Sequence, residues 1–125
     1  LSGNPLAVAA GLETLRGLEA DNPYEKLEML GSRLECGINE KAAERGARVQ
    51  VNRVGSMLTL FLADQPVNDF PSAKASDTGR FELFFRKILA EGIYWPPSQF
   101  EAAFISTAHT EADIDETIDA IGRSL

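Results

Sequence analysis

The fold of this chain is decided by residues 22–63, which read NPYEKLEMLGSRLECGINEKAAERGARVQVNRVGSMLTLFLA. Apolar residues in the first half recur at three- and four-residue steps, the spacing of one face of a helix. These residues are Leu27, Leu30, Leu34, Ile38 and Ala42. Gly46 can adopt the left-handed conformation that commonly ends a helix. The pattern therefore predicts a long amphipathic helix that ends at Gly46.

The second half of the same stretch predicts two neighbouring strands. Val49, Val51 and Val54 are interleaved with polar residues, which is typical of a half-buried strand. Residues 57–63 form an apolar run that suits a buried strand. Between them, residues 55–56 are Gly-Ser, which favours a turn or a bulge.

Asn-Pro pairs precede the first two expected helices. Asn4 can accept an otherwise unpaired amide hydrogen bond, and Pro5 lacks only an N–H group that the first helical position does not need. We therefore expect a helix over residues 5–19. The pair Asn22-Pro23 predicts the same kind of start for the long second helix.

The rest of the chain predicts two more helices and two short strands. Residues 65–76 show no period and contain two prolines, which indicates a surface loop crossing the sheet. A third helix is expected between a cap at Ser76 or Asp77 and Gly92, with three phenylalanines toward the core. Residues 93–95 and 102–107 are strand candidates. Thr110 and Asp113 resemble a capping box that opens the last helix.

This order of elements predicts an α+β fold, with helices packed on one face of a small antiparallel sheet. Residues 21–125 would form that domain. Residues 1–20 would form a separate linking helix, whose apolar residues serve a neighbouring domain that precedes them.

Composition limits the classes of partner. The chain has 125 residues, and its 12 basic and 19 acidic residues give a net charge of -7. That charge disfavours nucleic acids and anionic membrane surfaces. An apolar run of about 18 residues, as a membrane span requires, is missing from the sequence. We therefore expect a soluble cytoplasmic protein with no nucleic-acid or membrane partner.

Candidate chemical groups are few. One cysteine and one histidine leave no Cys/His cluster of metal-ligand spacing, so no metal site is expected. His109 is interpreted as a structural histidine that bonds nearby backbone. The four lysines lie on charged helices or in a polar loop, which is typical of solvated amines. Glu101 stands among aromatic residues and prolines, so its charge must be solvated, paired or functional.

Three motifs carry a family resemblance. Pro-Pro-Ser-Gln-Phe-Glu-Ala at residues 96–102, Ala-His-Thr-Glu at 108–111 and Leu-Ser-Gly-Asn-Pro at 1–5 resemble the C-terminal part of glutamate-1-semialdehyde 2,1-aminomutase. That family is a pyridoxal-phosphate (PLP) enzyme of the subgroup III aminotransferases. The resemblance implies the small domain of a fold-type I PLP enzyme, with the PLP-binding large domain and the Schiff-base lysine elsewhere in the protein. No catalytic residue is then expected in this chain, which would be inactive alone.

The resemblance also implies roles for individual residues. Glu101 would reach the active-site cleft near the arginine that binds the substrate carboxylate, and would position the substrate. Ser98 and Gln99 would be adjacent to the cleft. Ser2 and Gly3 would lie near the phosphate of the PLP held by the opposite subunit of a homodimer, although the Gly-Thr pair that contacts it is absent here.

Two other interpretations remain open. The chain could be part of a related aminotransferase for a β-amino acid or a similar substrate, since such enzymes share most of these motifs. It could also be a stand-alone acidic α+β binding module, because its sequence contains no complete catalytic set. Under that interpretation Glu101 is an ordinary exposed glutamate at the start of a strand.

Overall fold

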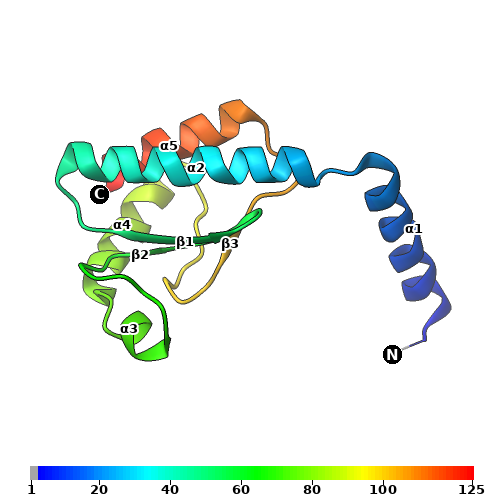
Figure 1. Cartoon of the computed structure of the whole chain (residues 1–125), viewed down its shortest axis with the longest axis horizontal. Helices are drawn as coiled ribbons and strands as arrows, with labels where there is room; N and C mark the ends of the chain where they lie inside the picture. Colours follow the sequence, from blue (N-terminus) through cyan, green and yellow to red (C-terminus); the bar gives the residue numbers. More distant parts are fainter. Residues whose placement is uncertain (1–2) are drawn as a thin grey trace.

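The computed structural model describes residues 3–125, which form an α+β domain with one helix projecting from it (Figure 1). In chain order the elements are α1 Pro5–Asp21, α2 Tyr24–Arg45, β1 Gln50–Val54, β2 Met57–Phe61, α3 Phe70–Lys74, α4 Thr78–Ala90, β3 Ala103–Phe104 and α5 Glu111–Ser124.

The sheet is antiparallel, with strand order β1-β2-β3. Met57 marks its register, because this residue pairs with Val54 on β1 and with Phe104 on β3. Helices α2 and α5 pack together along one face of the sheet, and α4 packs against α5 (Figure 1). The expected α+β architecture, with helices on one face of a small antiparallel sheet, is confirmed.

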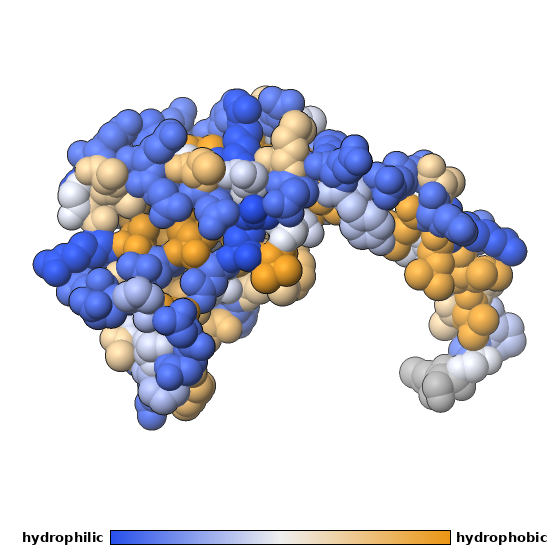
Figure 2. Space-filling model, viewed as in Figure 1, coloured by the Kyte–Doolittle hydropathy of each residue, from blue (hydrophilic) through white to orange (hydrophobic). Residues whose placement is uncertain are grey.

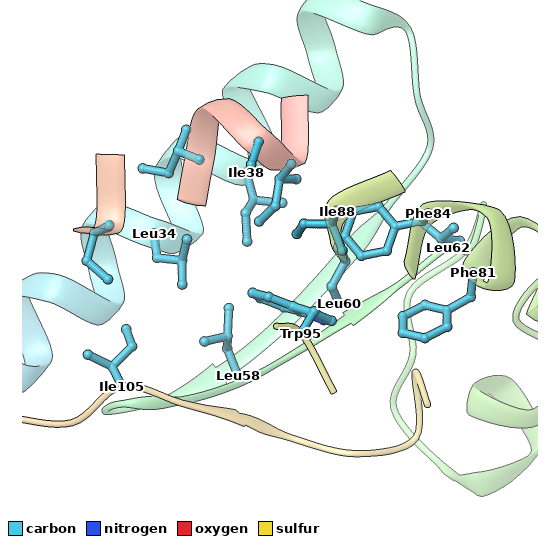
Figure 3. Packing of buried hydrophobic residues seen from close by; sticks show 14 of the residues in the cluster. Leu34, Ile38, Leu58, Leu60, Leu62, Phe81, Phe84, Ile88, Trp95 and Ile105 are labelled. Atoms are coloured by element: carbon cyan, nitrogen blue, oxygen red, sulfur yellow. The ribbon is translucent and has the colours of Figure 1, made fainter. Parts of the chain in front are cut away.

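The core lies between the sheet and these helices. Leu58 and Leu60 of β2 point into it and are almost fully buried (Figure 3). Phe84 of α4 meets the ring of Trp95 edge to face, with ring centroids 6.4 Å apart. Edge-to-face contact is a favoured geometry of aromatic pairs. Trp95 therefore fixes the start of the segment that leads to Glu101.

The helix ends show how local sequence sets the boundaries. The Asn4 side chain accepts hydrogen bonds from the amides of Leu6 (3.0 Å) and Ala7 (3.2 Å), so the predicted cap of α1 is confirmed. Gly46 ends α2 at a φ of 63°. The prediction for Asn22 was wrong: it ends α1 in the left-handed conformation instead of capping α2. Asparagine tolerates that conformation better than most residues do.

Three other details differ from expectation. The loop of residues 65–76 contains the short helix α3, which a capping box between Asp69 and Ser72 stabilises. Residues 93–95 form no strand; Trp95 is in the core, and the two prolines that follow it have no N–H to donate to a ladder. Strand β3 is only two residues long, although the Ile105 amide still donates to the Ser56 carbonyl at 2.9 Å.

Helix α1 buries none of its residues against the rest of the described chain. Its apolar side chains lie exposed along the projecting helix, as the orange patch in Figure 2 shows. The large exposed ones are Leu6, Val8, Leu12 and Leu15. Across residues 3–125, no helix combines the length and the apolarity that crossing a bilayer requires.

Candidate functional site

Glu101 lies at the end of a tight turn that Ser98 organises. The Ser98 carbonyl accepts the amide of Glu101 at 3.1 Å. The Ser98 hydroxyl accepts the amide of Phe100 at 3.2 Å. Serine hydroxyls commonly cap such turns by bonding the backbone two residues on. The half-buried Ser98 thus shapes the backbone that presents Glu101.

Two further hydrogen bonds attach this turn to strand β2 and the residue after it. The Gln99 side chain is only 2% exposed, and its Oε1 accepts the Leu62 amide at 3.3 Å. The Thr59 hydroxyl donates to the Glu101 carbonyl at 3.4 Å. These two bonds hold Gln99 and Glu101 of the turn against β2 and the residue that follows it. Neither Thr59 nor Leu62 carries a sequence signal for this role, because both read simply as strand residues.

The Glu101 side chain is exposed and borders a cavity of about 370 Å³. Aromatic and proline residues form much of the cavity lining, including Tyr94, Trp95, Pro96 and Phe104. Glu101 is the only carboxylate among the lining residues, and it forms no ion pair within residues 3–125. Its charge is therefore available to a group outside the described chain.

His109 borders the same cavity, but its ring already accepts a hydrogen bond from the backbone. The Ser106 amide donates to Nδ1 at 2.9 Å, and the Ser106 hydroxyl lies 3.1 Å from the same atom. A ring nitrogen that accepts a backbone N–H is unprotonated, so neutral His109 carries its proton on Nε2. This geometry agrees with a structural histidine that shapes the turn before α5.

The structure does not bring all the expected site residues together. Glu101 and Ser98 share one turn, whereas the Gln99 side chain points into the protein and does not line the cavity. Gly3 precedes α1, and the beginning of that helix lies away from the sheet and the other helices (Figure 1). Ser2 lies outside the described residues.

The lysines of this chain do not fit a PLP site on their own. A Schiff-base lysine needs a desolvated, unpaired amine. Lys26 donates to the Thr107 carbonyl (2.9 Å), Lys41 pairs with Asp119 (3.3 Å), and Lys87 donates to the Ser124 carbonyl (3.2 Å). Lys74 is exposed at the end of α3. No cluster of three or more potential metal-ligating side chains occurs in the described part of the chain.

Comparison with known proteins identifies the relatives. A glutamate-1-semialdehyde 2,1-aminomutase of Thermus thermophilus is 56% identical over the whole chain. This chain is similar in sequence to the C-terminal part of the glutamate-1-semialdehyde 2,1-aminomutases. The enzyme of that name from an Anaeromyxobacter species is 58% identical over 96% of the chain. The chain spans about 30% of the length of these relatives. No family model matches it.

Among solved structures, an omega-transaminase from Sphaerobacter thermophilus superimposes with a TM-score of 0.81. The match covers 98% of this chain and 28% of the transaminase chain, at 22% sequence identity. The α+β fold of this chain is thus the fold of one part of an aminotransferase.

Proposed function

We propose that this chain is the C-terminal domain of a PLP-dependent aminomutase that converts glutamate-1-semialdehyde to 5-aminolevulinate, a precursor of tetrapyrroles such as porphyrins. The observation that carries the proposal is the 56% identity, over the full chain, to an aminomutase of that specificity. The identity to the structurally similar omega-transaminase is only 22%. Sequence similarity therefore favours the aminomutase over other amino-group transfer enzymes.

In this proposal residues 1–20 link a large PLP-binding domain to a C-terminal domain of residues 21–125. The exposed apolar side chains of α1 support the linking role, because they need a covering surface that residues 3–125 do not supply. Ser2 and Gly3 would lie near the phosphate of the PLP bound in the opposite subunit of a cytoplasmic homodimer. The cofactor and its lysine belong to the rest of the protein.

Glu101 would act by positioning the substrate and not by making or breaking bonds. A carboxylate beside the arginine that binds the substrate carboxylate would partly neutralise that arginine and tune which substrate end is accepted. Two features of Glu101 support this role. Its carboxylate forms no ion pair within residues 3–125, and its backbone donates a hydrogen bond to the Ser98 carbonyl and accepts one from the Thr59 hydroxyl. Fixed orientation of this kind contributes to catalysis by reducing the entropy lost in the reaction.

The test uses the intact protein, loaded with PLP and incubated with glutamate-1-semialdehyde in the absence of any 2-oxo acid. We expect formation of 5-aminolevulinate, because an aminomutase retains the amino group within the product. An aminotransferase would instead require a 2-oxo acid acceptor and would turn over an amino acid donor. Amino-group transfer to a 2-oxo acid without 5-aminolevulinate formation would contradict the proposal.

A further inference from the structure

The Gln99 side chain is buried at a cost. It is 2% exposed, and its Oε1 makes one hydrogen bond, to the Leu62 amide at 3.3 Å. Its Nε2 has no hydrogen-bond partner among residues 3–125. A buried donor without a partner is destabilising, but an apolar side chain at this position would instead leave the buried Leu62 amide without its acceptor. The amide oxygen is therefore the part of this side chain that the surrounding backbone requires.

The Gln99 side-chain amide fixes the position of one backbone segment relative to another. Gln99 and Leu62 are 37 residues apart in sequence, and their bond joins the turn of residues 98–101 to the segment that follows β2. Leu62 is itself buried in the core. The bond therefore ties the turn to a rigid part of the domain.

Because Gln99 and Glu101 lie in the same turn, fixing Gln99 also restrains the backbone of Glu101. Only Phe100 separates the two residues, and the bond from the Glu101 amide to the Ser98 carbonyl closes the turn around Gln99. The weaker Thr59 bond holds the far side of the turn at 3.4 Å. If the Gln99 bond were lost, Phe100, whose side chain is exposed, would offer little packing to keep the turn in place.

We propose that Gln99 is a positioning residue that sets where the Glu101 carboxylate lies in the active site, through the hydrogen bond that its buried amide oxygen accepts from the Leu62 amide. The inference rests on the proposed role of Glu101 and adds a second residue to it. Gln99 itself touches neither substrate nor cofactor in this scheme.

A double-mutant cycle in the intact, PLP-loaded protein tests whether Gln99 acts through Glu101. Gln99→Met keeps the length and approximate volume of the side chain but removes the acceptor oxygen. We expect it to lower kcat/KM by about tenfold in the wild-type background, because small displacements of a positioning group are costly. In a Glu101→Gln background the same change should have almost no further effect. The exposed Gln65→Met serves as the matched control, with unchanged kcat/KM in both backgrounds.

The outcomes separate this inference from the proposed function. Equal losses from Gln99→Met in both backgrounds would show a general structural role and overturn the inference, as would an absence of any effect of Glu101→Gln. In either case 5-aminolevulinate formation by the wild type still decides the proposed function independently. If Gln99→Met fails to fold, Gln99→Asn gives the same cycle, because it keeps an amide that is one methylene too short to reach Leu62 without moving the turn.

Discussion

Gly31 on helix α2 lies directly against the backbone carbonyl of Gly55 in the β1–β2 turn. A Cβ atom at position 31 would overlap that carbonyl oxygen. Arg53 donates to the same carbonyl from Nη1 at 2.8 Å, and to Glu35 on α2 from Nε at 2.7 Å. The hairpin is thus held onto α2 by a close backbone approach and by an ion pair. Because β2 supports the Glu101 turn, this contact also determines where the candidate site lies.

Gly31→Ala is expected to destabilise the domain by about 2–3 kcal/mol, because the atom that the new methyl meets is backbone and cannot rotate away. Gly79→Ala on α4 is the matched control, since its new methyl would make only ordinary contact, at 3.4 Å from Asp77 Oδ1. In the control we expect no loss, or a gain of up to about 1 kcal/mol. Thermal unfolding of both variants measures the difference, and equal midpoints would contradict the close approach.

The capping box of α5 predicts a pH dependence of stability. Hydrogen bonds from the amide and hydroxyl of Thr110, both 2.7 Å long, hold the pKa of the Asp113 carboxyl below its ordinary value of 3.8. A carboxyl whose pKa is lower in the folded state stabilises the fold above its unfolded pKa. That stabilisation is lost as the pH falls through the folded pKa.

Asp113→Asn should therefore lower the unfolding temperature at pH 7, and the deficit should shrink once the pH falls below about 3.8, the ordinary value. Glu116→Gln, a neutralising change at an exposed position of the same helix, should show little difference from the wild type at either pH. Thermal unfolding at pH 7 and pH 3 provides the comparison. A deficit of the same size at both values would mean that the Asp113 charge is not responsible.

The exposed face of α1 predicts a contact in the intact protein. Leu15 and Leu83 are exposed to nearly the same extent in this chain, 65% and 63%, on different helices. If the preceding domain covers α1, Leu15→Ser should cost the intact protein about 1.5–3 kcal/mol, the value of burying such a side chain. Leu83→Ser on α4 should stay within about 0.5 kcal/mol of the wild type. Comparable thermal shifts in the two variants would argue against a covered α1.

Sequence patterns predicted the parts of this fold that depend on helix-capping residues and on the apolar period of a long helix. The apolar period of α2, the cap at Asn4 and the Thr110–Asp113 capping box all follow from residues a few positions apart. The errors occurred where two local preferences compete or where an element is very short. Asn22 can either cap a helix or adopt the left-handed conformation, and the chain direction between α1 and α2 decides which.

Tertiary contacts determined the remainder. Helix α3 is too short to show an apolar period, and Trp95 leaves the expected strand because its ring fills the core beside Phe84. At the candidate site, the sequence motif identified Glu101 and its neighbours. The burial of the Gln99 side chain and its bond to Leu62 depend on how the turn folds back onto β2, which no local pattern reveals.

In the proposed function, this domain contributes Glu101 to the substrate site of an aminomutase. The most direct test compares steady-state kinetics of intact wild type and Glu101→Gln with glutamate-1-semialdehyde, using Glu40→Gln, an exposed change on α2, as the control. We expect Glu101→Gln to keep the visible absorbance of bound PLP and to lose about tenfold in kcat/KM, with Glu40→Gln unchanged. Unaltered kinetic constants in Glu101→Gln would show that Glu101 does not position the substrate.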